Sequence, residues 1–278
     1  MAKVQIARTN AALIADVDGT SSRAGGGCFW WLGQHSFIVK VGGRVVYIDP
    51  FLSPLPARQT PPLLLPSDVT NADLVLVSHG HLDHLDPFAL RGIGSASPDA
   101  VFVCPKTEAH RLVEEAGIAE SRIRAASADE HLHEAGFAVT TIKAKHEFFH
   151  EDPELGFPFL GFVLERDGAR LYHAGDTIPW DGLEALLRTW PRLDAALVPI
   201  NGRDAERLKN NIMGNLTFQE AAELAGELNV GLAVPAHYDM FIGNQEDPAR
   251  FVDFLEAKYP HVPHWVGSAG ECVPFGAR

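Results

Sequence analysis

A cluster of histidine and aspartate side chains follows directly after a short apolar run in the first third of the chain. The apolar run is Leu-Val-Leu-Val at residues 74–77, and the cluster is His79-Gly80-His81-Leu82-Asp83-His84. A continuous apolar run fits a β-strand that is covered on both faces, so the cluster should lie in a sharply turned loop at the end of a buried strand. Imidazole nitrogen and carboxylate oxygen are usual protein ligands of zinc, manganese and iron. The sequence therefore predicts a metal site at the edge of a covered sheet.

The spacing of this cluster resembles the His-x-His-x-Asp-His signature of the metallo-β-lactamase superfamily of hydrolases. The four signature positions are His79, His81, Asp83 and His84. The resemblance implies three further ligands: a histidine after a later strand, an aspartate that bridges two metal positions, and a last histidine near the C-terminus. Each has a candidate soon after a short β-favouring run, and the candidates are His146, Asp176 and His237. Ligands at strand ends are held by the sheet while their side chains stay accessible, as a preorganised site requires.

Within the superfamily, the chain resembles most the branch of L-ascorbate-6-phosphate lactonase and its uncharacterised metal-dependent hydrolase relatives. The resemblance covers the chain from about residue 29 onward. It is carried by residues 30–33, 48–51, 172–177, 200–203, 214–217 and 235–239. It implies hydrolysis of a small anionic lactone, with a phosphorylated sugar lactone as one candidate. A small-molecule or cyclic phosphodiesterase would use the same ligands, and a non-catalytic ligand-binding protein that kept the fold is a third alternative.

The resemblance also divides the predicted ligands between two metal positions. The first position has His79, His81 and His146, the second has Asp83, His84 and His237, and Asp176 bridges them. A bound divalent cation lowers the pKa of coordinated water to about 7 and polarises a carbonyl or phosphoryl oxygen of the substrate. We expect one or two ions, zinc or manganese with iron as a third choice, because these ligands suit all three metals. If one position is filled, Asp83 is free to orient the attacking water and to move its proton, so Asp83 is also the predicted catalytic residue.

Three residues are predicted to bind the substrate. Asn201 and Arg203 directly follow a predicted strand at the site edge, and an arginine can bind a phosphate or carboxylate through two parallel hydrogen bonds. A solvated loop is the alternative for Arg203, and it is equally open for Arg207 and Lys209. Tyr238 follows the ligand His237 and has a hydroxyl that can donate to a developing oxyanion, with packing as the alternative.

Strands in two sets, with helices between them, predict an α/β (α+β) fold: a four-layer αββα sandwich, as the superfamily implies. The strands include residues 36–41 and 44–48, joined by Gly42-Gly43 as a hairpin. Helices are predicted around residues 109–116 and 183–190, and a capping-box pattern at Thr217 and Glu220 predicts the start of a third. We expect a single hydrolase domain at residues 28–278, preceded by an N-terminal extension at residues 1–27. The Pro-rich segment 53–67 is a candidate lid.

Charge and composition narrow the functional class. The net charge of −13 disfavours a nuclease, because affinity for nucleic acid depends on clustered lysine and arginine. The three cysteines are far apart and show no metal-binding spacing. The sequence shows neither a signal peptide nor a membrane span, so we expect a cytoplasmic enzyme with a small-molecule substrate. Whether it forms a homo-oligomer is left open.

The remaining histidines are expected to lie outside the metal site, with one exception. His131 and His133 are predicted to lie in a surface loop, because the surrounding stretch is polar and offers no further ligands. His173 precedes the turn at Asp176 and is predicted to order backbone rather than to contact metal. His150, four residues after His146, is the one serious alternative ligand.

Overall fold

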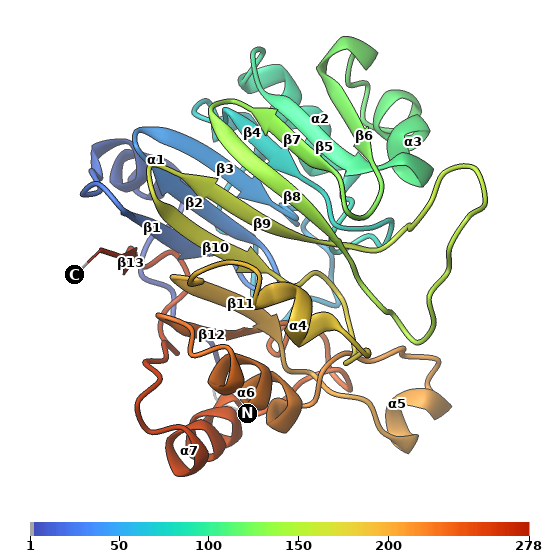
Figure 1. Ribbon diagram of the computed structural model, residues 1–278. Helices are drawn as coiled ribbons and strands as arrows, with labels where there is room; N and C mark the ends of the chain where they lie inside the picture. Colours follow the sequence, from blue (N-terminus) through green and yellow to red (C-terminus); the bar gives the residue numbers. More distant parts are fainter. Residues whose placement is uncertain (1–2, 278) are drawn as a thin grey trace.

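Two β-sheets pack face to face in the computed structural model, which describes residues 3–277 (Figure 1). In this part of the chain, the first sheet has seven strands, in the order β13 (Val273–Gly276), β1 (Gly26–Trp31), β2 (Phe37–Val41), β3 (Arg44–Ile48), β4 (Leu74–Leu76), β5 (Val101–Pro105) and β6 (Ile123–Ala126). The second has six, in the order β12 (Ala233–Ala236), β11 (Ala195–Pro199), β10 (Ala169–His173), β9 (Leu160–Arg166), β8 (Phe137–Lys143) and β7 (His131–Glu134).

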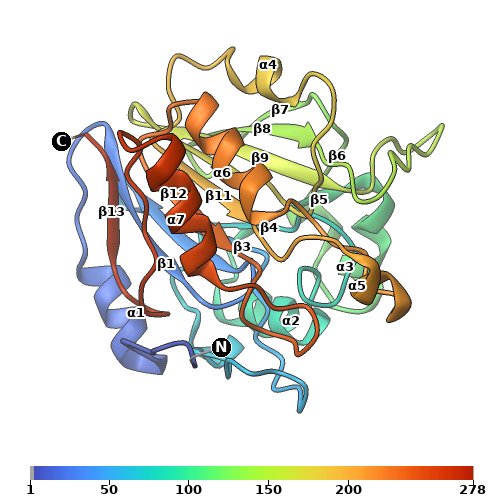
Figure 2. The same cartoon turned by 90° about the horizontal axis from the view of Figure 1, so that it is seen from below.

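Helices cover the outer sides of the two sheets (Figures 1 and 2). Those that follow strands of the first sheet are α2 (Pro87–Ala96) and α3 (Ala109–Glu114), and those associated with the second are α4 (Leu183–Leu187), α6 (Phe218–Glu227) and α7 (Pro248–Lys258). The short helix α5 (Ala205–Lys209) lies in the connection between β11 and α6. Residues 3–277 also contain three single turns of 3-10 helix: Pro66–Asp68, Lys106–Glu108 and Glu120–Arg122. The predicted αββα arrangement is confirmed.

Local sequence signals account for several element ends. The β2–β3 hairpin turns at Gly42 and Gly43, whose φ angles of 55° and 78° are those of a type I′ turn that favours glycine. Helix α6 begins with the predicted capping box, in which the Thr217 side chain accepts from the Glu220 backbone and the Glu220 carboxylate accepts from the Thr217 backbone. Helix α4 is shorter than its apolar pattern predicted: it ends at Leu187, and Trp190 lies outside it.

The N-terminal segment packs against the same core as the rest of the chain. Helix α1 (Asn10–Gly19) buries Leu13, Ile14 and Val17 in the core cluster. The Trp30 indole donates a hydrogen bond to Asp16, and strand β1 begins at Gly26, two residues before the predicted domain start. The division of the chain at residue 27 stays a prediction. Within residues 3–277, no helix is both long enough and apolar enough to cross a membrane.

Candidate metal centre

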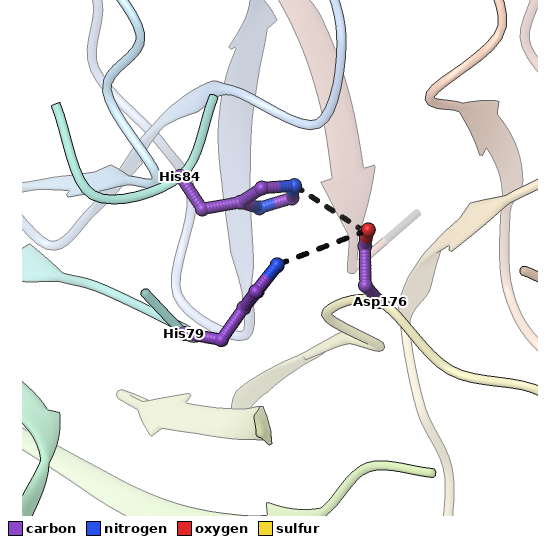
Figure 3. A group of neighbouring side chains, drawn as sticks. All are labelled: His79, His84 and Asp176. Atoms are coloured by element: carbon purple, nitrogen blue, oxygen red, sulfur yellow. Dashed lines mark ion pairs between the residues drawn. The ribbon is translucent and has the colours of Figure 1, made fainter. Parts of the chain in front are cut away.

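The seven side chains predicted as metal ligands converge at one edge of the sandwich. Their ligand atoms form three overlapping groups, within each of which the atoms lie within 4.8 Å of one another: His79, His84 and Asp176; His81, His146 and Asp176; and Asp83, His84 and His237. Figure 3 shows how His79 and His84 point toward Asp176, whose carboxylate oxygens lie 3.9 Å from His79 Nε2 and 3.4 Å from His84 Nε2. Asp176 thus belongs to two of the groups and links the histidines of both.

Strand direction explains why segments so far apart in the sequence meet here. The signature loop follows β4, which lies between two parallel neighbours in the first sheet. In the second sheet β10, β11 and β12 are parallel, and β8 runs in the same direction because β9 is antiparallel to both β8 and β10. The C-terminal ends of β8, β10 and β12 therefore share one edge, and each is followed by a predicted ligand.

The predicted second metal position, at Asp83, His84 and His237, has a supporting residue that the sequence analysis did not identify. Asp49 Oδ2 lies 2.7 Å from His84 Nδ1 and also accepts a hydrogen bond from the Ser78 hydroxyl. This contact fixes the His84 ring and leaves Nε2 facing the cluster, as an outer-shell carboxylate does in metal sites. Burial opposes protonation of His84, but the carboxylates of Asp176, Asp83 and Asp49 raise its pKa to about 10.

The first position, at His79, His81 and His146, is packed chiefly by an aromatic ring. The Phe159 ring centroid lies 4.9 Å from that of His79, 5.7 Å from that of His81 and 5.0 Å from that of His146. Burial lowers the pKa of His146 to about 4, and burial together with the neighbouring His84 holds the pKa of His79 well below its usual value. These imidazoles are neutral at pH 7 and can offer a lone pair to a cation.

The unpaired polar atoms of the cluster fit a divalent cation. His84 Nε2, His146 Nδ1 and Asp176 Oδ1 are buried and have no hydrogen-bond partner within the described residues. His84 Nε2 and Asp176 Oδ1 face each other as an ion pair 3.4 Å apart, and the carboxylates that favour a proton on His84 would equally favour a divalent cation among these atoms. Imidazole nitrogens and carboxylate oxygens in this number suit zinc, manganese or iron.

Comparison with known proteins gives the chain its family. The model of the β-lactamase superfamily domain matches residues 44–238, which include the whole signature, His146, Asp176 and His237. A UPF0173 metal-dependent hydrolase from Desulfitobacterium hafniense is 32% identical over 247 residues, covering 85% of this chain and 90% of that protein. The chain belongs to the UPF0173 metal-dependent hydrolases of the metallo-β-lactamase superfamily.

Solved structures agree with the fold of this metal-dependent hydrolase. Igni18, a metallo hydrolase from Ignicoccus hospitalis, has a TM-score of 0.71 at 23% identity and covers 91% of this chain and 100% of its own. An isothiocyanate hydrolase from Delia radicum gut bacteria has a TM-score of 0.70 at 18% identity, covering 90% of this chain and 100% of its own. At these identities the likeness shows the fold alone. The finer resemblance to the ascorbate lactonase branch stays a prediction.

The three predicted substrate-binding residues of the hydrolase are each engaged with other protein groups. The Arg203 guanidinium donates to both carboxylate oxygens of Glu220, at 2.6 and 2.7 Å. The Asn201 side chain is buried between Asn244, to which it donates, and Asn215, from which it accepts. The Tyr238 ring stacks on Trp31, with 5.2 Å between ring centroids, and is 5% exposed. Their role in substrate binding stays a prediction.

The other histidines lie outside the three groups. His150 is exposed, and its ring packs 6.1 Å from that of Phe159. His131 and His133 lie in strand β7 and not in a loop, because residues 131–134 pair with β8; both side chains are exposed. His173 is buried and contacts the backbone, with Nε2 3.0 Å from the His35 carbonyl oxygen and Nδ1 accepting from Gly175 N–H.

Besides Phe159, two polar residues that contact the ligands were missed by the sequence analysis as parts of the site. Asp49 follows β3, the parallel neighbour of β4, so its place at the same sheet edge was a usable signal. Gln34 lies in the turn after β1, and its side chain contacts Asp83 and His237. No pattern in the sequence distinguishes Gln34 from a surface glutamine.

Proposed function

We propose that this metal-dependent hydrolase opens a small lactone, with Asp83 as the residue that handles the proton of the attacking water. The observation that carries the proposal is the accessibility of Asp83. Its side chain is 19% exposed, whereas the side chains of His84 and Asp176 are 0% and 5% exposed. A carboxylate at the open side of a metal cluster is placed to meet both water and substrate.

The reaction divides between the bound metal and the side chains. A divalent cation held by the cluster supplies an acidified water and polarises the lactone carbonyl. Asp83 orients the water and accepts its proton on Oδ1 as the new C–O bond forms, because Oδ2 faces His84 Nε2 and His237 Nε2. When the ring C–O bond breaks, Asp83 returns that proton to the departing ring oxygen, so the product is a hydroxy acid and the carboxylate is regenerated.

The state of Arg203 favours a carbonyl over a phosphoryl substrate. A phosphodiester brings a charge that a cationic side chain normally meets, and Arg203 was the predicted group. Its guanidinium is already bound by the Glu220 carboxylate, so a phosphate would have to displace Glu220. An uncharged lactone needs no such displacement. Arg203 can therefore bind an anionic group on the lactone only if its guanidinium leaves Glu220.

A small apolar electrophile is the second candidate. Leu82 lies between the ligands His81 and Asp83 in the sequence, and Phe148 lies two residues after His146; these two residues are 48% and 59% exposed. Exposed apolar side chains next to a reactive site favour an apolar substrate group. A structural neighbour is an isothiocyanate hydrolase, and an isothiocyanate carries an electrophilic carbon that water can attack.

Parallel assays with one preparation test the proposal. The protein is stripped of metal, reconstituted with Zn²⁺ or Mn²⁺, and assayed with a neutral lactone, a phosphorylated lactone, a cyclic phosphodiester and benzyl isothiocyanate. We expect lactone hydrolysis that depends on added metal and falls at least a hundredfold in Asp83→Asn, about 2.7 kcal/mol of barrier. Metal-dependent turnover of the phosphodiester with neither lactone cleaved would overturn the proposal.

A further inference from the structure

The turn after β1 places a buried glutamine against the second metal position. Gln34 is 1% exposed and has a φ of 53°, a left-handed conformation that is uncommon outside glycine. Its N–H donates to Asp239 Oδ1 at 2.8 Å, and its carbonyl oxygen accepts from His237 N–H at 2.8 Å and from the Trp31 indole at 3.0 Å. Three hydrogen bonds therefore hold its main chain, one of them to the backbone of a predicted ligand.

The Gln34 side chain extends from this fixed backbone to Asp83. Its amide nitrogen Nε2 donates to Asp83 Oδ2 at 2.7 Å. The same nitrogen lies 3.2 Å from His237 Nε2 and 3.3 Å from His237 Nδ1. Nearly equal distances to both ring nitrogens place the amide beside the ring and not in line with the Nε2 lone pair. The amide therefore restrains Asp83 and leaves His237 Nε2 available to a cation.

The oxygen that Gln34 binds is the one that faces the other ligands. Asp83 Oδ2 lies 3.6 Å from both His84 Nε2 and His237 Nε2. A carboxylate oxygen can accept two contacts, so Oδ2 can receive the amide N–H and still offer a lone pair to a cation. The Asp83 side chain is more exposed than those of the two histidines, so the surrounding protein packs it less tightly and a hydrogen bond is needed to fix its orientation.

We propose that Gln34 is a positioning residue that aims Asp83 Oδ2 into the second metal position. The proposal rests on the proposed function only for its kinetic part, since metal binding is measured without substrate. Outer-shell contacts of this kind contribute about ten- to a hundredfold in metal affinity or activity. The competing explanation is that Gln34 merely fills space under the site. In that case an apolar side chain of similar size should serve equally well.

Cobalt titration separates the two explanations. Chelator-treated native protein, Gln34→Leu and Gln34→Asn are titrated with Co²⁺ while the visible d–d absorption is recorded. We expect Gln34→Leu to weaken one Co²⁺ equivalent ten- to a hundredfold, to change the d–d spectrum, and to leave the other equivalent within threefold. Gln34→Asn keeps the amide on a shorter stem and serves if the leucine variant does not fold. The matched control is Gln59→Leu, because Gln59 is exposed and, within residues 3–277, its side chain makes a single hydrogen bond, to the Ala57 carbonyl at 3.4 Å.

A double-mutant cycle with Asp83→Asn completes the test. If Gln34 acts through Asp83, adding Gln34→Leu to Asp83→Asn should weaken Co²⁺ binding less than twofold further, because the two losses are not independent. With a cleaved substrate, Gln34→Leu should lower kcat at least tenfold and change KM little. A native Co²⁺ titration and spectrum in Gln34→Leu, or additive losses in the cycle, would overturn the inference. If no substrate is cleaved, the proposed function fails and the Co²⁺ cycle still decides the role of Gln34.

Discussion

The two predicted metal positions of the cluster are built in different ways. The second position is held by sheet-edge residues: Asp49 holds His84, and the turn at Gln34 contacts both Asp83 and His237. The first position needs His146 from the long β8–β9 connection, which extends to the right in Figure 1, and His146 Nδ1 has no partner within the described residues. One position is thus preorganised by the core of the fold, and the other is completed by a loop.

The loop of the first position is held next to His146 by two hydrogen bonds, in which Lys145 N–H donates to Thr177 Oγ1 at 3.0 Å and the Lys145 carbonyl accepts from Ile178 N–H at 2.8 Å. Beyond residue 146 it is held by aromatic packing. The Phe149 ring lies 5.7 Å from that of Trp180 and 5.9 Å from that of Phe157, and the Lys143 ammonium lies 5.1 Å from the Phe149 ring. Such contacts are less directional than the hydrogen bonds to Asp49 and Gln34. The contrast teaches that ligand identity alone does not define a site. We therefore expect substitutions in the two halves to differ most in their effect on stability.

The largest effect is expected at Asp176, which both halves share. Asp176→Asn keeps the shape but replaces a charged ligand oxygen with an amide. We expect at least a thousandfold loss of hydrolysis, about 4 kcal/mol of barrier, and loss of most bound metal. The measurements are kcat/KM on the best substrate and metal content by elemental analysis. Native metal content in Asp176→Asn would contradict the idea that this residue links the halves, and His150→Ala is the control with no expected change.

A comparison of His84→Ala with His81→Ala tests the difference between the halves directly. Each should lower hydrolysis strongly, by less than Asp176→Asn does, and should lower bound metal. In the metal-free protein, His84→Ala should also lower the free energy of unfolding by about 3 kcal/mol, because it leaves the buried Asp49 carboxylate without its imidazole partner. His81 is exposed, so His81→Ala should lower it by less than about 1 kcal/mol. Urea unfolding in chelator measures both, and equal losses would remove the proposed contrast.

The sequence alone did not predict most of this difference between the two positions. The αββα fold and the seven converging residues followed from apolar runs, a spacing pattern and a family resemblance, because each candidate stands near the end of a strand. The residues that hold the ligands in place, such as Gln34, could not be predicted in this way. Gln34 acts through a left-handed turn and hydrogen bonds to residues some 50 and 200 positions away, which local patterns do not encode. The pairing of Arg203 with the capping-box residue Glu220 was missed for a similar reason, since it joins two separate local motifs.

We expect the free energy of unfolding to fall in acid because of two buried histidines next to the cluster. Burial lowers the pKa of His173 to about 3, and its ring packs 4.0 Å from the buried His35, whose pKa burial lowers to about 4. Between those values and about 6.5, the unfolded chain binds protons that the folded chain does not, so stability is present above pH 6.5 and is lost as the pH falls. Each group contributes a slope of up to about 1.4 kcal/mol per pH unit.

His173→Phe isolates one of the two contributions. Phenylalanine keeps a flat ring but does not titrate, so the variant should be less stable at pH 7.5 yet lose less stability between pH 6.5 and 4.5. Urea unfolding of metal-free protein at several pH values measures the slope. A variant slope equal to that of the native protein would show that His173 does not carry the acid sensitivity. His133→Ala is the control, because His133 is exposed on β7.

The smallest effect is expected at Arg203, which lies outside both halves. In its ion pair with Glu220, the Arg203 side chain is 35% exposed and the Glu220 side chain is 28% exposed. Because solvent screens such a pair, Arg203→Ala should lower the free energy of unfolding by about 1 kcal/mol or less. On a neutral lactone, kcat/KM should stay within about twofold, below the ~1.4 kcal/mol of a tenfold change. Metal content should not change.

The decisive assay uses a phosphorylated lactone with native enzyme, Arg203→Ala and Arg203→Lys. If only this substrate loses thirtyfold or more, and lysine restores part of the loss, Arg203 leaves Glu220 to bind the anion and the sequence-based prediction holds. If the phosphorylated and neutral lactones respond alike, Arg203 serves α6 alone, and substrate selection depends on the residues around the two metal positions.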